Sequence, residues 1–308
     1  MLALTGKPSR VSVETVLQVA PSQIWQAIAA APQRFILVGD ADHSSNAVRH
    51  ELRRGLPCLA KGGVGHLAIE YPHDAVATEL EAFNRHGPVR SLFNRLQGIG
   101  AFSNAHQTVW ELPAYWATLY RLFNTARRHG MQLHALDSLN LRQPDPAALQ
   151  KVCAVLDPAH QRVKEENSEL EMGLRLYLAA HGYKPPALTD AEKTAGGMLK
   201  QAYHLCALKG DWQRAHMLQI AAGVSRAALL YGFDHFSGRH GIEPIGHYLP
   251  AQEQVYVALG TGSFMLREYK TTSTLRLPDF VIMADQQKGH VTPQAIRRGL
   301  WPAAGGAA

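Results

Sequence analysis

Acidic, histidine and hydroxyl side chains directly follow the short apolar runs of this sequence. They are Asp40 and His43, Glu70 and Tyr71, Asp137 and Ser138, Asp234 and His235, Thr261 and Ser263, and Asp285. Short apolar runs are typical of buried parallel strands, and the carboxyl ends of parallel strands meet at one edge of a sheet. Ligands bind at this edge in open α/β sheets, so we expect these side chains to line one crevice.

Two of these turns repeat one pattern, in which a strand is followed by a glycine and then by Asp-His. The first is residues 39–43, Gly-Asp-Ala-Asp-His, and the second is residues 232–235, Gly-Phe-Asp-His. A lone histidine is most often a structural residue, but the same local pattern at two strand ends favours a functional pair. We predict that His43 and His235 face each other across the strand ends.

The carboxylates differ in how well a structural role explains them. Aspartate after a strand is a common helix cap or turn residue, which accounts well for Asp137 and Asp285. Glutamate is a poor cap, and the carboxylate of Glu70 at the end of an apolar strand needs a partner or water. We therefore predict a functional role for Glu70, with Asp40 in the neighbouring turn.

Arginine and histidine side chains outside these turns are further candidates. Arg214 lies on a helix predicted over residues 211–223, with Asp211 as its N-cap and Gly223 as its C-cap. It is available to stabilise an anionic transition state. His216 is two residues away and cannot point in the same direction, so it is the lesser candidate. His240 follows the second Asp-His turn and is a candidate for the same crevice.

Two kinds of chemistry suit this set. His43, Glu70 and His235 have the ligand types that hold a divalent zinc, manganese or iron ion, which would activate water. Without a metal, the same set provides a histidine general base oriented by a carboxylate. The spacing does not decide between them, and the sequence has no HExxH or other compact metal motif.

The order of the strands and helices that must position these residues predicts an α/β fold, in which helices flank a mainly parallel sheet. Strands are expected at 35–38, 66–71, 131–136, 227–232, 254–260 and 279–284, and helices at 45–60, 74–86, 110–129, 211–223 and within 239–249. Residues 98–106 are expected to form an ordered loop. We predict one domain over residues 1–308, with a helical insertion or cap at about 144–210.

Composition narrows the function classes. The net charge is +6, but the Lys and Arg residues are scattered, which favours an anionic substrate over nucleic acid. Three cysteines without a CxxC pair indicate a reducing compartment. No secretory signal or membrane-spanning apolar run is visible, so we expect a cytoplasmic protein, with secretion without a classical signal left open. The sequence does not indicate an oligomeric state.

The segments that carry these candidates resemble the erythromycin-esterase/ChaN-like group and the related TraB/TIKI proteins. The matching residues are Val38 to His43, Leu67 to Glu70, Arg214 with Met217 and Ile220, and Tyr231 to His235 with Gly241, Ile242 and Leu249. These families share a GExxH or GxxH turn, a strand ending in Glu, an Arg-containing helix and a second GxxH turn. The resemblance spans about residues 33–250.

The resemblance implies an α/β core with helical insertions and one of three activities. The esterase branch implies ester hydrolysis or water-mediated ring opening with His43 as general base. The TIKI branch implies metal-dependent peptide hydrolysis, and the ChaN branch implies haem or iron binding. The chain has Asp40 where the esterase motif has Glu, and Gly232 where esterases often have a further His. The second turn is closer to the TIKI form.

We therefore expect a hydrolase-like enzyme that acts on an ester, lactone or amide bond of a small-molecule or peptide substrate. Its site residues are Asp40, His43, Glu70, Arg214 and His235. One alternative is a haem- or iron-binding protein without turnover, with Tyr71 or a histidine such as His240 as the ligand. Another is a secreted effector that reuses the fold.

Overall fold

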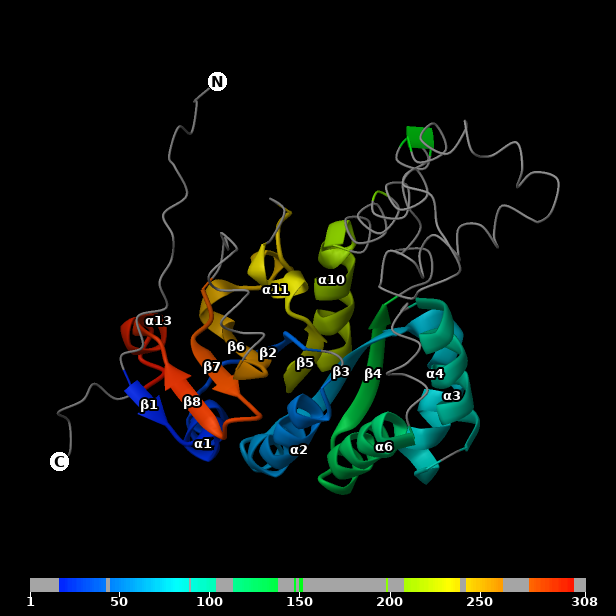
Figure 1. The fold of residues 1–308 in the computed structure, drawn as a ribbon, viewed down its shortest axis with the longest axis horizontal. Coiled ribbons are helices and arrows are strands. Elements are labelled where there is room, and N and C mark those ends of the chain that lie inside the picture. Colours follow the sequence, from blue (N-terminus) through cyan, green and yellow to red (C-terminus); the bar gives the residue numbers. More distant parts are fainter. Residues whose placement is uncertain are drawn as a thin grey trace, which may run out of the picture.

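One mixed eight-stranded sheet organises the chain in the computed structural model, which describes residues 17–42, 45–88, 90–103, 113–137, 147, 150–151, 198, 208–238, 242–262 and 277–301. The strand order is β1-β8-β7-β6-β2-β5-β3-β4 (Figure 1). The strands are β1 (Leu17–Val19), β2 (Phe35–Asp40), β3 (Val64–Pro72), β4 (Gln132–Asp137), β5 (Arg226–Gly232), β6 (Gln254–Gly260), β7 (Phe280–Met283) and β8 (Lys288–Val291). The strands from β7 to β4 are all parallel, and β8 and β1 extend the sheet in antiparallel pairing.

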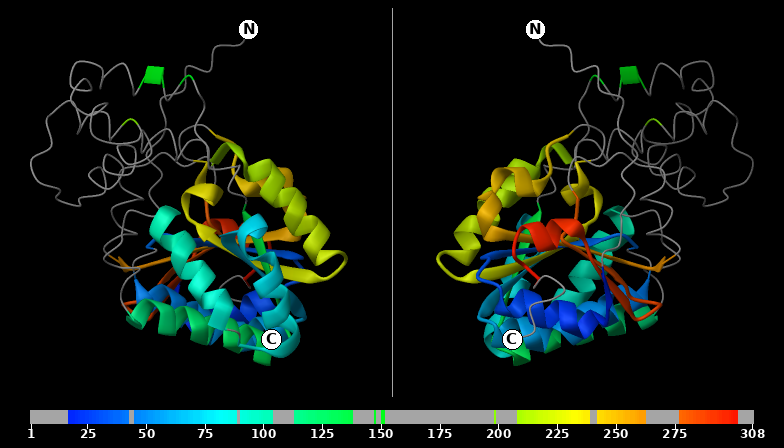
Figure 2. Two further views of the ribbon diagram at one scale, coloured as in Figure 1. Left: turned by 90° about the vertical axis from the view of Figure 1, so that its right-hand side faces the viewer. Right: turned by 90° about the vertical axis from the view of Figure 1, so that its left-hand side faces the viewer.

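Helices cover both faces of this sheet. They are α1 (Pro21–Ala30), α2 (Asn46–Lys61), α3 (His73–His86), α4 (Arg90–Ser103), α6 (Pro113–Arg128), α10 (Asp211–Ala222), α11 (Asp234–Ser237) and α13 (Pro293–Arg297), with short 3-10 helices η3 (Ile245–Tyr248) and η4 (Ala251–Glu253). Apolar residues of α1, α2, α3, α4, α6 and α13 build the core on one face. Residues of α10, α11 and η3 build a second core on the other face. Figure 2 shows α10 on the opposite side of the sheet from α1 and α2.

The central strand β2 is buried along its whole length because it has a parallel neighbour on each side and a core on each face. Its alternate side chains enter the two cores, Ile36 and Val38 on one face and Phe35 and Leu37 on the other. A continuous apolar run is what such a strand requires, because neither face meets water.

After the adjacent strands β2 and β5, the chain continues to opposite faces of the sheet. The chain continues from β2 to α2, whose apolar residues lie in the first core, and from β5 to α11, whose residues lie in the second. Asp40 at the end of β2 pairs in register with Gly232 at the end of β5. Such a point opens a crevice outside the strand ends, where ligands bind in α/β sheets.

At the amino ends of the strands, on the other side of the sheet from the crevice, Arg226 joins the start of β5 to the ends of two helices. Its guanidinium donates to the carbonyl oxygens of Ile28, Ala29 and Gln33, each at 2.9 Å, and also to the carbonyl of Gly62. A cation suits these carbonyls because those of Ile28, Ala29 and Gly62 lie at the negative ends of α1 and α2. One side chain thus fixes both helices to the start of β5.

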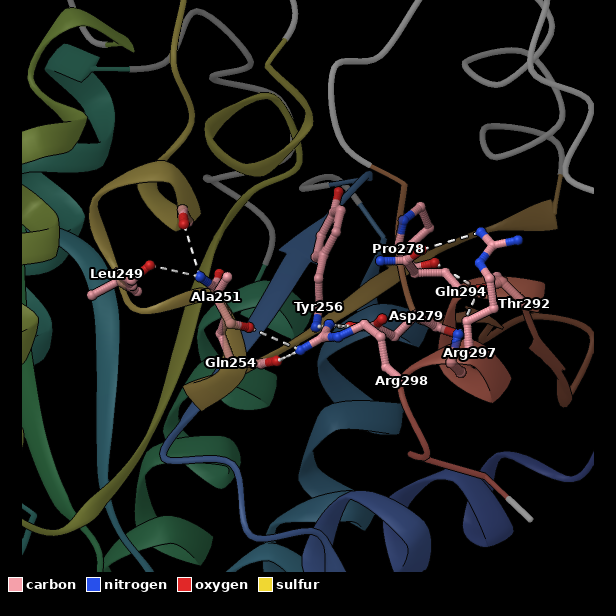
Figure 3. Close-up of polar contacts among 12 residues, drawn as sticks. Leu249, Ala251, Gln254, Tyr256, Pro278, Asp279, Thr292, Gln294, Arg297 and Arg298 are labelled. Atoms are coloured by element: carbon pink, nitrogen blue, oxygen red, sulfur yellow. Dashed lines mark hydrogen bonds and ion pairs between the residues drawn. The ribbon is translucent and has the colours of Figure 1, made fainter. Parts of the chain in front are cut away.

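Arg298 makes a similar set of contacts at the amino ends of β6 and β7 (Figure 3). Its Nη1 lies 2.6 Å from Oδ2 of Asp279, and its Nη2 donates to the carbonyl oxygens of Ala251 and Gln254. Oδ2 of Asp279 also accepts the backbone N–H of Tyr256 at 2.8 Å. These bonds connect the segment after α13 to the starts of β6 and β7.

The predicted α/β class and the six predicted parallel strands are confirmed, with bounds within about two residues for each strand. The structure adds β1 and β8, which the sequence did not indicate. The helices predicted over 45–60, 74–86, 110–129 and 211–223 are observed as α2, α3, α6 and α10. Within the predicted 239–249 helix, the structure has the shorter 3-10 helix η3.

Two local predictions are wrong. Residues 98–103, predicted as part of a loop, continue helix α4, whose Leu92 and Leu96 pack into the first core. The N-cap of α10 is Gly210, and Asp211 is the first residue of the helix. Gly223 ends α10 as predicted, with the positive φ of 54° that glycine tolerates. The predicted insertion at 144–210 lies almost entirely outside the described residues.

No helix in the described ranges is both long enough and apolar enough to span a membrane.

Candidate functional site

The carboxyl ends of β2, β5 and β3 are connected at the edge where the sequence predicts a site. Oε2 of Glu70 accepts the backbone N–H of Gly232 at 2.8 Å. The next backbone N–H, that of Phe233, donates to the carbonyl oxygen of Asp40 at 2.9 Å. Both bonds hold the turn after β5, so the start of α11 has a fixed position between β2 and β3.

This turn places His235 against two carboxylates. Its Nδ1 lies 2.6 Å from Oδ1 of Asp211 on α10, and its Nε2 lies 3.7 Å from Oε1 of Glu70 on β3. Only 6% of His235 is exposed, whereas 24% of the Glu70 side chain is. The imidazole is therefore held from inside the protein by Asp211 and presents its other nitrogen toward a carboxylate that solvent can reach.

The charge state of His235 follows from these neighbours. Burial alone would lower the pKa of His235, but the charge of Asp211 and its hydrogen bond, together with Glu70, raise this pKa to about 9. The imidazole is therefore an imidazolium at neutral pH. In that state His235 is a proton donor, whereas the sequence suggested a base or a metal ligand.

Arg214 completes a buried chain of charges behind His235. Its Nη1 lies 2.9 Å from Oδ1 of Asp211, and its Nη2 lies 2.7 Å from Oδ1 of Asp137 at the end of β4. Burial would lower the pKa of Arg214, and the charge of Asp137 with those of Tyr231 and Asp211 raises it above the ordinary arginine value. The side chain is fully buried. The structure thus gives Arg214 a positioning role, in contrast to the expected contact with an anionic transition state.

Asp211 is the residue of this site that the sequence analysis missed. It looked like a helix cap because an acidic residue stood at the start of a predicted helix. The available signal was its spacing, since Asp211 and Arg214 are three residues apart and side chains at that spacing share one face of a helix. That face is turned toward the strand ends.

The turn after β2 is held by its own carboxylates. Oδ1 of Asp40 accepts the backbone N–H of Asp42 at 2.9 Å, and Oδ2 of Asp42 accepts the hydroxyl of Thr261 at 2.8 Å. Asp40 thus shapes this turn. His43, the next residue after Asp42, lies outside the described residues, so its predicted pairing with His235 stays a prediction.

The other predicted site residues are dispersed. Tyr71 lies in the core on the face of β3 that also carries Ile69, so its side chain is on the opposite face from that of Glu70. His216 is exposed on α10, and His240 lies outside the described residues. The structure therefore does not bring Tyr71 to the strand-end site.

The described residues contain no group of three or more His, Cys, Asp or Glu side chains arranged to hold a metal ion. Nε2 of His235 and Oε1 of Glu70 are two donors of the types that zinc or iron accepts. The hydrogen bond between Nδ1 of His235 and Oδ1 of Asp211 is the kind of support that metal-ligating histidines commonly have. His235 and Glu70 alone are too few ligands for a zinc site.

The fold and site together define an α/β protein with an Asp-His-Glu arrangement at the carboxyl edge of its sheet. No protein-family model matches the chain, and no curated protein matches it. Among solved structures, the type III effector HopBA1 is similar at 16% identity over 79% of this chain and 86% of its own, with a TM-score of 0.38. A Bacillus cereus protein is similar at 12% identity over 75% and 66%, with a TM-score of 0.42.

Proposed function

We propose that the protein is a hydrolase in which Glu70 and His235 act on water and on the leaving group of an ester, lactone or amide. One observation carries this proposal: His235 is held by Asp211 at 2.6 Å while its Nε2 stands 3.7 Å from Oε1 of Glu70. That distance is too long for a direct hydrogen bond. A water molecule or a substrate oxygen placed beside the pair can contact both groups at hydrogen-bond distance.

In this arrangement the two side chains have complementary roles. Oε1 of Glu70 takes a proton from a water molecule, and the oxygen of that water attacks the carbonyl carbon of the substrate. The His235 imidazolium stabilises the negative charge that develops on the substrate and donates its proton to the leaving oxygen or nitrogen as the carbon–heteroatom bond breaks. Asp211 keeps the imidazole oriented and favours its charged form.

The substrate class follows from the charges. A cationic imidazolium and a net charge of +6 favour a substrate with an anionic or strongly polarised carbonyl group. A small molecule and a peptide both satisfy this requirement. His43, whose residue type and chain position suit a second proton-transfer group, belongs to the proposed site on the strength of the sequence alone.

The metal-dependent version of this enzyme, with His43, Glu70 and His235 as ligands, is a separate expectation. Elemental analysis of the purified protein decides it, because a stoichiometric zinc, manganese or iron content would replace the acid–base roles described here. The haem-binding alternative is tested by titration with haem, where a Soret band is required.

The decisive experiment measures hydrolysis of p-nitrophenyl esters, a lactone and an aminoacyl anilide by the wild type and by Glu70→Gln. We expect turnover of at least one substrate class and a loss of about 100-fold or more in the variant, the usual contribution of a general base. Glu81→Gln is the matched control, because Glu81 is an exposed residue paired with Arg85 on the surface of α3. Equal rates for wild type and Glu70→Gln would contradict the proposal.

A further inference from the structure

A second pair of histidines lies on the sheet away from the strand-end site. Nδ1 of His66 on β3 and Nε2 of His134 on β4 are 2.9 Å apart, with the ring centroids 5.1 Å apart. Both residues are half-buried. His66 precedes Glu70 by four residues on the same strand, a separation of about 13 Å at the ordinary rise of a strand. The two sites are therefore distinct.

The sheet holds these rings together. On β3, Leu67 pairs in register with Leu133 of β4, and both side chains enter the first core. Strand alternation then turns His66 and His134 to the other face, the face that α10 covers. β4 ends the order of described strands, so this pair lies beside an edge of the described sheet.

Each ring turns one nitrogen toward the other, and these two nitrogens share a hydrogen bond. An imidazole binds a metal ion through a nitrogen that carries a free lone pair. The two facing nitrogens are therefore the atoms that one ion between the rings would contact.

The facing nitrogens are 2.9 Å apart because they share a hydrogen bond, which places both within reach of one ion. With metal–nitrogen bonds of about 2.0–2.1 Å, neighbouring nitrogen ligands are about 2.9 Å apart in tetragonal copper(II) and nickel(II) sites and about 3.4 Å apart in tetrahedral zinc sites. The tetragonal ions therefore require the smaller movement of the rings. Copper(II) also binds nitrogen ligands more tightly than the other divalent ions of its row.

We propose that His66 and His134 form a two-histidine site for a divalent copper ion, with water in its remaining positions. On binding, the ring that donates the hydrogen bond releases that proton to water and takes one up at its other nitrogen, so that both facing nitrogens carry lone pairs. A small rotation of the rings then directs both lone pairs at the ion. The bound ion would link β3 to β4 in place of the hydrogen bond between the two rings.

The test is calorimetric titration with copper(II) chloride of the wild type, His66→Ala and His134→Ala. We expect one tight site per chain in the wild type, with electron paramagnetic resonance showing two nitrogen ligands. Each variant should bind about tenfold more weakly or worse, since even the loss of a partner behind a ligand costs about tenfold. His247→Ala is the matched control, because His247 is an exposed histidine on η3 whose ring lies near Glu243.

Binding in both variants equal to that of the wild type would overturn the proposal, as would a wild type without a tight site. A second measurement needs no variant. Copper(II) should protect His66 and His134 of the wild type from diethyl pyrocarbonate, and equal modification with and without copper would also overturn it.

Discussion

Oδ1 of Asp211 lies 2.6 Å from Nδ1 of His235 inside the protein, and this contact sets the charge and the direction of the imidazole at the strand ends. A short bond between a carboxylate and an imidazole stabilises the imidazolium and fixes the direction of the ring. The nitrogen that remains, Nε2, is then the one aimed toward Glu70. The acid of the proposed pair is thus made by a residue on α10 that does not itself reach the substrate.

Replacing Asp211 by Asn should change the pH dependence of hydrolysis more than its maximum. The amide keeps the shape and removes the charge that raises the pKa of His235, so the alkaline loss of activity, near pH 9 in the wild type, should move down by about one to two pH units. Measurement of kcat against pH checks this. Asp74→Asn, a change of an exposed aspartate in the first turn of α3, is the control and should keep the wild-type profile. An unshifted alkaline limb in Asp211→Asn would exclude the positioning role.

The same pKa predicts how stability depends on pH. Because the folded protein holds the pKa of His235 at about 9, above its unfolded value of 6.5, the stabilisation is complete below pH 6.5 and is lost as pH rises through 9. The free energy of unfolding should fall by an amount on the order of 3 kcal/mol across that window. Urea denaturation at a series of pH values measures it. His235→Gln should lack this decline, and a decline equal to that of the wild type would contradict the assignment.

Removing Arg214 should destabilise the fold strongly. Arg214→Met leaves Asp137 and Asp211 buried without their shared cation, and breaking a buried ion pair from one side costs about 3–5 kcal/mol. Chemical denaturation compares this variant with Arg85→Met, which breaks the exposed Arg85–Glu81 pair and should cost less than about 1 kcal/mol. If the two variants were equally stable, the buried chain of charges would not support the fold.

Much of the fold was predictable because the central strands are buried on both faces. Residues 35–38 and 255–259 are continuous apolar runs for this reason, and parallel pairing then brings Glu70 and the turn before His235 to one edge. The antiparallel pair β1 and β8 was not predictable, because strands of three and four residues with partial burial carry little pattern of their own.

The roles of the individual site residues were less predictable than the location of the site. An aspartate at a helix start has the same local sequence whether it caps the helix or holds a histidine from another element. The spacing of Asp211 and Arg214 places both on one face of α10, but the contact of Asp211 with His235 depends on how α10 packs against the end of β5. Likewise, the sequence cannot show that Asp137, far away in the chain, neutralises Arg214 and removes it from solvent.

Arg226 offers a test of the edge opposite the site. Its guanidinium donates to four carbonyl oxygens from the ends of α1 and α2 and from the loop before β2, so Arg226→Ala leaves all four without this donor. We expect a loss of about 2–4 kcal/mol in the free energy of unfolding. Arg226→Lys keeps the charge but not the planar fork, and should recover only part of that loss. Urea denaturation ranks the three proteins, and full recovery by lysine would show that charge alone, without the geometry of the fork, holds the helix ends.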